Sequence, residues 1–205
     1  MKKLLLTAFE PFGGKVMNAS QEVANSLADL SFAQVQLEVL ILPVSRFEAV
    51  DIMLQAMAAL KPDVILMLGE SGGRFQVTPE RVAINADDFI IPDNTGHQPQ
   101  GEPINPQGPV GYFSGLPIYR LVQQLRQAGI PVAISDTAGL YLCNRLFYRV
   151  MEVIAHQQLP IKAGFIHVPY LHEQVMGHGL NVPSLSRATL VQAMQIVIEV
   201  CLADH

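Results

Sequence analysis

Val64-Ile65-Leu66-Met67-Leu68 is the stretch that decides the fold, because its residues are all apolar and leave no polar face. Lys61-Pro62 stands just before it and Gly69 just after it, so residues that favour turns bound the run. A short, unbroken apolar run of this kind is typical of a strand buried on both faces of a sheet. We therefore expect the central strand of a parallel sheet that helices cover on both sides.

On both sides of this run, strand patterns alternate with helix patterns. We expect further strands at 3–8, 35–42, 132–135 and 163–168, and helices after a cap at Asn18 or Ser20 and at 46–60, 114–128, 140–157 and 186–202. The helical spacing puts Leu30 and Phe47 on the buried sides of the first two helices. The alternation predicts an α/β fold, a single domain over residues 1–205 with a twisted, mostly parallel (mixed) sheet and helices on both faces.

The composition restricts the kind of protein and its partners. Half of the 205 residues are hydrophobic, yet no apolar run is long enough to span a membrane. We therefore expect no membrane partner, and an apolar surplus that favours a homo-oligomer. The net charge of −5, with scattered Lys and Arg, argues against nucleic acid. Cys143 and Cys201 are too few for a disulfide framework, which predicts the reducing cytoplasm.

The segment from about 70 to 109 is the longest irregular part of the chain. It is rich in Gly, Pro, Asn and Asp and is broken by a strand-like pattern at 81–86. Irregular segments of this length inside compact domains usually have a function or are disordered. We expect a lid, a pocket wall or a subunit contact here, and the pattern does not choose among them.

A candidate nucleophile follows the expected strand at 132–135. In Ser135-Asp136-Thr137-Ala138-Gly139-Leu140-Tyr141-Leu142-Cys143-Asn144 the strand ends, small residues make a turn, and a helix begins. Cys143 falls in the first turns of this helix, where free backbone N–H groups and the helix dipole favour a thiolate and an oxyanion. The alternative is a buried structural cysteine, which is the role we expect for Cys201.

A cysteine nucleophile needs a base, and His167 at the end of the strand at 163–168 fits best. The carboxylate that orients such a histidine is left open among Glu80, Asp87, Asp88 and Asp93, because spacing does not choose among them. His172 and His178 lie near Glu173, but their separation matches no usual metal-ligand pattern. We expect no metal and no cofactor.

Several motifs now carry a resemblance to a known family. They are, in order along the chain, Phe9-Glu10-Pro11-Phe12-Gly13-Gly14 with Asn18 and Ser20, Pro79-Glu80-Arg81-Val82-Ala83-Ile84-Asn85, Ile91-Pro92-Asp93-Asn94, Ala138-Gly139 with Tyr141 and Cys143-Asn144, and Gly164-Phe165-Ile166-His167-Val168-Pro169. Over essentially its whole length the sequence resembles pyroglutamyl peptidase I, a cysteine peptidase family. The resemblance implies a cytoplasmic, homotetrameric omega-peptidase that removes an N-terminal pyroglutamyl residue from peptides through a thioester acyl-enzyme.

The resemblance also implies roles for individual residues. Cys143 becomes the nucleophile, His167 the base and then the acid, and Glu80 the orienting carboxylate. The residues implied to surround the pyroglutamyl ring are Phe9, Phe12, Asn18, Val44, Glu70, Ile91, Tyr141 and Leu142. Two other functions stay open: a related amidase that acts on another small cyclic or N-acyl group, and a non-catalytic protein that binds a small molecule.

The sequence departs from the family's usual pattern at three places near these motifs. Ile90 stands where many relatives carry Arg, Glu70 where they often carry Gln, and Asp136-Thr137 where an Asn-Ser pair is common. The added carboxylates are expected to raise the pKa of Cys143 if they lie close to it. The loss of an arginine removes a positive charge that would act in the opposite direction.

Overall fold

A five-stranded sheet is the framework of the part of the chain that the computed structural model describes, which is residues 1–176 and 181–203. Its order is β2-β1-β3-β7-β4. Four strands run parallel, and they are β1 (Lys2–Phe9), β2 (Val35–Leu42), β3 (Val64–Glu70) and β7 (Lys162–Val168). The short edge strand β4 (Thr78–Pro79) pairs antiparallel with β7. The expectation of a mostly parallel, mixed sheet is confirmed.

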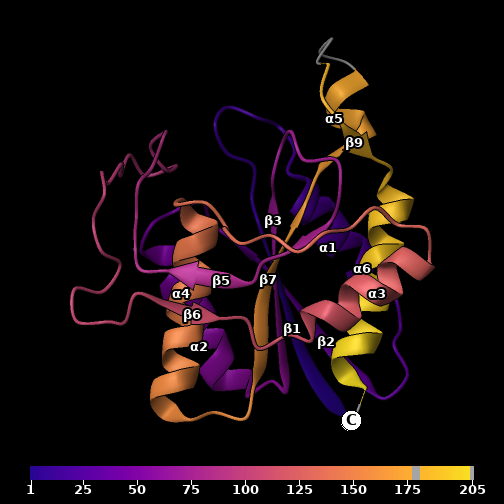
Figure 1. The fold of residues 1–205 in the computed structure, drawn as a ribbon, viewed down its shortest axis with the longest axis horizontal. Helices are drawn as coiled ribbons and strands as arrows, with labels where there is room; N and C mark the ends of the chain where they lie inside the picture. The colour runs from indigo at the N-terminus through magenta and orange to yellow at the C-terminus, as the bar shows by residue number, and fades with distance from the viewer. Residues whose placement is uncertain (177–180, 204–205) are drawn as a thin grey trace.

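Helices cover both faces of this sheet (Figure 1). One face packs against α1 (Ala19–Ala28), α3 (Ile118–Gln127) and α6 (Arg187–Leu202), and the other against α2 (Glu48–Leu60) and α4 (Leu142–Gln157). Side chains of β3 alternate between the two cores, since Leu66 lies in the first and Met67 in the second. The run at 64–68 is therefore buried on both faces, as its composition predicts.

The remaining elements are short. They are the hydrogen-bonded pair β5 (Val82–Ile84) and β6 (Gly111–Phe113), the pair β8 (Tyr170–Leu171) and β9 (Ser184–Leu185), and the helix α5 (His172–Met176). Turns, bends and irregular backbone make up most of the segment 71–109, while Glu70 belongs to β3. No helix among the described residues is long and apolar enough to cross a membrane.

Two side chains expected in the core are exposed. Leu30 lies beyond the end of α1 at Ala28, and Phe47 precedes the start of α2 at Glu48. In both cases the apolar spacing continues past the hydrogen-bonded helix, so the residue no longer follows the helical face. These two predictions were wrong because periodicity does not by itself locate a helix end.

Two further boundaries differ from the expected ones. The helix expected from residue 114 begins at Ile118, because Ser114 Oγ accepts a hydrogen bond from the Leu116 N–H within a turn that precedes Pro117. The strand expected at 132–135 is reduced to two isolated bridges, which join Val132 to Val77 and Ser135 to Glu80. The second bridge matters for the site, since it ties Ser135, at the start of the turn before Cys143, to Glu80, the residue after β4.

Candidate active site

Strand alternation and helix placement bring Cys143 and His167 to the same side of the sheet. His167 follows Phe165 by two residues on β7, and Phe165 packs in the core beneath α4. Cys143 lies at the start of α4. Gly69, near the end of β3, has no side chain, and a Cβ atom there would lie 2.8 Å from Cys143 Sγ. The absence of a side chain at Gly69 therefore leaves space for the Cys143 sulfur at the carboxyl end of the sheet.

A pocket of about 180 Å³ lies where these elements meet. Its lining residues are Phe9, Phe12, Asn18, Val44, Glu70, Ser71, Ala138, Tyr141, Leu142, Cys143 and His167. Seven of the eight residues expected around the substrate are in this set. The eighth, Ile91, is not in the set: it is 40% exposed, and its Cδ1 is 3.4 Å from where a Gly13 Cβ would stand. Ser71 and Ala138 were not predicted.

Aromatic rings form much of the pocket wall. Tyr141 packs against Phe12 and Phe89, with ring centroids 6.0 Å and 4.5 Å apart, and its hydroxyl donates to the Pro92 carbonyl. Asn18 is buried and fixed, because its side chain accepts from the Ser20 N–H at the start of α1. The pocket is therefore an apolar slot with a few oriented polar groups, which suits a small, flat, uncharged ligand.

Glu80 is the carboxylate that contacts His167. The antiparallel edge strand β4 sets Thr78 opposite His167, and the Glu80 N–H that follows donates to the Phe165 carbonyl at 2.9 Å. His167 Nδ1 then donates to Glu80 Oε1 at 2.7 Å, and the Glu80 side chain is fully buried. With Nδ1 used in this way, Nε2 is left as the acceptor of the neutral ring.

The three competing carboxylates have other surroundings. Asp87 is buried and forms ion pairs with Arg46 and Arg145. Asp93 accepts hydrogen bonds from the backbone of Arg46, Thr95 and His97. Asp88 is exposed. The first two fix the loop that follows β5, and of the four carboxylates Glu80 is the one hydrogen-bonded to His167.

Arg74 is a site residue that sequence reasoning missed. Its guanidinium donates to Glu80 Oε1 at 2.7 Å, to the Thr78 hydroxyl, and to the Thr137 carbonyl at 3.2 Å. It therefore links β4 and Glu80 to the turn that leads to Cys143. In the sequence its only signal is the preceding Gly72-Gly73, which indicates a turn and no chemistry. Arg74 places a positive charge beside Glu80, whereas Ile90 is exposed.

Burial and neighbouring charges set the resting protonation of the pair. Burial, and after it the Glu80 carboxylate, raises the pKa of Cys143 to about 12, although Arg74 acts in the opposite direction. Burial also lowers the pKa of His167 below its usual value, with Arg74 adding to this and Glu80 opposing it. The resting site is thus a thiol beside a neutral imidazole. Burial and Glu80 thus act against the thiolate that the start of α4 favours.

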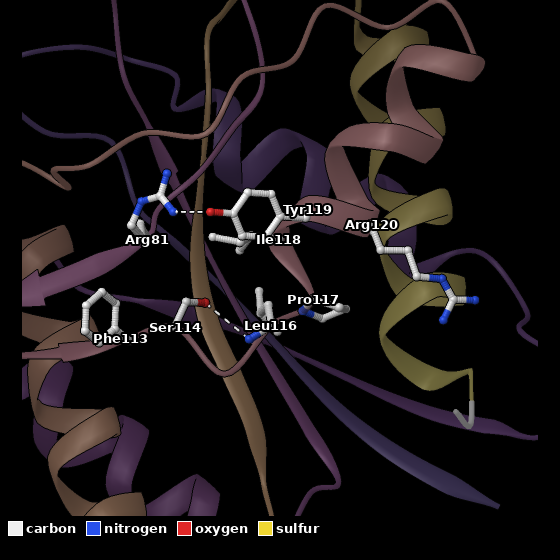
Figure 2. Close-up of a pocket in the computed structure, with 8 residues that line it drawn as sticks. All are labelled: Arg81, Phe113, Ser114, Leu116, Pro117, Ile118, Tyr119 and Arg120. Atoms are coloured by element: carbon white, nitrogen blue, oxygen red, sulfur yellow. Dashed lines mark hydrogen bonds between the residues drawn. The ribbon is translucent and has the colours of Figure 1, made fainter.

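The two added carboxylates affect Cys143 unequally. Glu70 raises the pKa of Cys143, but by less than Glu80 does. Asp136 is 75% exposed at its side chain and pairs with Arg81 at 2.5 Å. Figure 2 shows that Arg81 points into a separate hollow of the surface, where it also donates to the Tyr119 hydroxyl at 2.8 Å. Adjacent residues Glu80 and Arg81 therefore face different regions.

The histidines near α5 form no metal site that the structure describes. His172 Nδ1 lies 2.8 Å from the Ser184 hydroxyl, and His178 lies outside the described residues. Among residues 1–176 and 181–203, no group of three or more His, Cys, Asp or Glu side chains is arranged to hold a metal ion.

The fold and the site together define a class. A half-buried cysteine at a helix start, a neutral histidine at the end of a neighbouring strand, and a buried carboxylate behind it are typical of hydrolases that attack through a cysteine. In α/β proteins such groups gather at the carboxyl ends of the strands, as Cys143 and His167 do here. The class is therefore a cysteine hydrolase with an α/β fold.

Comparison with known proteins narrows this class to one family. A sequence model of the pyroglutamyl peptidase family matches residues 2–204. The pyrrolidone-carboxylate peptidase of Vibrio vulnificus is 46% identical over 202 residues, which cover 98% of this chain and 93% of that protein. The enzyme of the same name from Brevibacillus brevis is 41% identical, with 97% and 92% covered.

Solved structures agree with the sequence comparisons. Pyroglutamyl peptidase I from Bacillus amyloliquefaciens superimposes with a TM-score of 0.93 at 41% identity, covering 98% of this chain and 97% of that one. A mutant pyrrolidone carboxyl peptidase from the hyperthermophile Pyrococcus furiosus gives a TM-score of 0.93 at 39% identity, with 98% of each chain covered. The chain belongs to the pyroglutamyl peptidase family, and the resemblance stated from its motifs is confirmed.

Proposed function

We propose that this chain is a cysteine omega-peptidase that hydrolyses the bond after an N-terminal pyroglutamyl residue of peptides. One observation carries the proposal: a match to pyroglutamyl peptidases over residues 2–204 coincides with a pocket in which Cys143 and His167 lie together, with Glu80 hydrogen-bonded behind the histidine. The whole-length match supports the substrate class. The pocket supports the chemistry.

The first half of the reaction follows from the resting protonation states. His167 Nε2 takes the Sγ proton of Cys143 as the sulfur bonds to the pyroglutamyl carbonyl carbon. Proton transfer at this moment avoids a free thiolate, which the raised pKa of the Cys143 thiol, about 12, disfavours. The imidazolium then passes this proton to the departing amine nitrogen, and the C–N bond breaks. The shortened peptide leaves, and a thioester remains on Cys143.

The second half regenerates the enzyme. His167 takes a proton from a water molecule while the oxygen of that water attacks the thioester carbon. The C–S bond then breaks, and His167 returns the proton to the Cys143 sulfur. Glu80 holds the ring through Nδ1 and stabilises its charged form in both halves, as the 2.7 Å hydrogen bond supports. Free pyroglutamate is the second product.

Backbone amides at the start of α4 are the proposed oxyanion donors. In the part of the chain that the structure describes, no side chain caps this helix at Tyr141, so N–H groups of its first turn have no intrahelical partner. They lie beside Cys143, which begins the same helix. A developing oxyanion would receive hydrogen bonds from them in a site largely closed to water.

The size and polarity of the pocket support selection of a small lactam. Its volume of about 180 Å³ is below the range of ~300–1,000 Å³ of sites for larger ligands, so it holds one ring while the rest of the peptide stays outside. Phe9, Phe12 and Tyr141 supply apolar surface, and Asn18 supplies an oriented amide. A charged amino terminus would lose its hydration there.

A fluorogenic pyroglutamyl amide tests the proposal, with the corresponding prolyl amide as the control for lactam recognition. We expect the wild-type protein to release the fluorophore from the pyroglutamyl amide, and Cys143→Ala, His167→Ala and Glu80→Ala to lose most of this activity while still folded by circular dichroism. Absence of turnover by the folded wild-type protein would refute the proposal. Equal turnover by Cys143→Ala would remove Cys143 from the role of nucleophile.

We also propose that the chain forms a single folding unit, acts in the cytoplasm and assembles into a homotetramer. The family match extends over residues 2–204, which supports one unit, and both cysteines are unbridged, which suits a reducing compartment. Exposed apolar side chains such as Phe75, Val110 and Phe113 support association. Light scattering after size exclusion measures the mass in solution, and a monomer would contradict the tetramer.

A further inference from the structure

The Glu70 carboxylate is a buried negative charge in the wall of a pocket proposed to take an uncharged ring. Its side chain is 1% exposed and lines the pocket together with Cys143. Oε1 accepts from Lys15 Nζ at 2.9 Å, and Oε2 accepts from the Ala19 N–H at 2.8 Å and from Gln174 Nε2 at 2.6 Å. Of these three donors, Lys15 is the one that carries a charge.

Lys15 is held in place by more than its ion pair. Its ammonium group also donates to the Tyr170 hydroxyl at 2.8 Å and lies over the rings of Phe12 and Tyr170, 5.1 Å and 4.5 Å from their centroids. Burial alone lowers the pKa of Lys15, but the hydrogen bonds to Tyr170 and Glu70 outweigh burial and raise it above its usual value. Lys15 is therefore charged at neutral pH and stays opposite Glu70.

This arrangement decides which charge the pocket presents to a substrate. A pyroglutamyl ring carries a neutral amide N–H, whereas an ordinary prolyl terminus carries a protonated ring nitrogen in nearly the same shape. An unpaired carboxylate in a poorly solvated wall would attract the cation much more strongly than the neutral amide. Selectivity is a difference between two affinities, so it requires that this attraction be cancelled.

We propose that Lys15 is a specificity-determining residue, which pairs with Glu70, cancels the negative charge in the pocket wall and thereby maintains selection for a neutral lactam over a cationic N-terminal amine. The inference rests on the proposed function and deepens it. Lys15 acts through Glu70 and is not itself a catalytic residue. Its removal should relax selectivity by exposing the carboxylate, and removal of both partners should restore selectivity.

The test compares Lys15→Met, Glu70→Gln and the double variant in turnover of a pyroglutamyl amide and a prolyl amide. We expect Lys15→Met to increase the prolyl-to-pyroglutamyl ratio of kcat/KM about tenfold or more, which corresponds to an added attraction of ~1.4 kcal/mol. The double variant and Lys15→Arg should keep the wild-type ratio, and Glu70→Gln, which leaves the Lys15 cation unpaired, should not raise it. If Lys15 has only a structural role, the double variant should show the same ratio as Lys15→Met, and that result would overturn the inference. A wild-type ratio in Lys15→Met would also overturn it.

A matched control comes from helix α4. Arg149 and Glu152 form a similar pair, with side chains 31% and 5% exposed against 37% and 1% for Lys15 and Glu70, and neither lines the pocket. Arg149→Met should leave the substrate ratio unchanged, and a shift equal to that of Lys15→Met would count against the inference.

A binding experiment separates failure of this inference from failure of the proposed function. In a Cys143→Ala background, calorimetry compares 2-pyrrolidone with the pyrrolidinium cation and needs no turnover. Lys15→Met should strengthen pyrrolidinium binding relative to pyrrolidone by about tenfold, and equal effects on both ligands would overturn the inference. Absence of wild-type turnover bears on the peptidase assignment alone.

Discussion

Replacement of Arg74 by Met removes the positive charge that faces the Glu80–His167 pair. The side chain donates to Glu80 Oε1 at 2.7 Å and is 26% exposed, whereas Glu80 is fully buried. Arg74 lowers the pKa of both His167 and Cys143, so its loss raises both values. His167 acts as a base only while it is neutral, and the acid limb of the pH–rate profile therefore moves to higher pH.

The size of the effect follows from this geometry. Breaking a buried ion pair by removing one partner costs about 3–5 kcal/mol, and the partial exposure of Arg74 reduces this to ~2–3 kcal/mol of unfolding free energy by solvent screening. We expect the acid limb to move to higher pH, because the loss of Arg74 raises the pKa of His167. On that limb, kcat/KM for a pyroglutamyl amide should fall about tenfold.

The assay is kcat/KM for the pyroglutamyl amide between about pH 5 and 9, which reports the essential groups of the free enzyme. Arg74→Lys keeps the charge and should retain most of the wild-type profile, while Arg149→Met controls for the loss of an arginine from another buried glutamate. An Arg74→Met profile whose acid limb coincides with that of the wild-type protein would refute the role assigned to this charge.

Three further predictions test the surroundings of Cys143. In Gly69→Ala the new Cβ would stand 2.8 Å from Cys143 Sγ and from the Phe165 ring. We therefore expect kcat/KM to fall about tenfold or more, and the free energy of unfolding measured in urea to fall by ~1–3 kcal/mol. Wild-type activity in this variant would contradict the prediction. Iodoacetamide should label the half-buried Cys143 before the fully buried Cys201. Because the pKa of Cys143 is raised to about 12, the labelling rate should keep rising with pH, and a plateau near neutrality would indicate a preformed thiolate. Asp136→Asn should change kcat/KM by less than about twofold, since its exposed carboxylate pairs with Arg81; a tenfold loss would place this charge at the site.

The parts of the fold that depend on local pattern were predictable. The apolar run at 64–68 identified the central strand, and the alternation of strands with helices gave the layers. The positions of Cys143 and His167 were predictable because a helix start and a strand end each have a local sequence signature. Leu30 and Phe47 were misplaced because apolar spacing continues beyond the ends of α1 and α2.

The parts that depend on long-range contacts were not predictable from the residues alone. Glu80 reaches His167 through antiparallel pairing of an edge strand, and 87 positions separate the two residues. Lys15 and Glu70 are 55 positions apart, and neither carries a signal of its partner. Arg74 lies close to Glu80 in sequence, yet it also donates to the carbonyl of the distant Thr137. Charge partners across loops are set by tertiary structure, and periodicity does not report them.

The covalent step at Cys143 is the central claim, and trapping the acyl-enzyme tests it most directly. The wild-type protein is mixed with excess pyroglutamyl amide, quenched with acid within the first turnovers, and analysed by intact mass and peptide mapping. The mechanism predicts a mass increase of one pyroglutamyl group, confined to the peptide that contains Cys143 and absent from Cys143→Ala. Rapid turnover with an adduct on another residue, or an adduct of equal yield in Cys143→Ala, would contradict it.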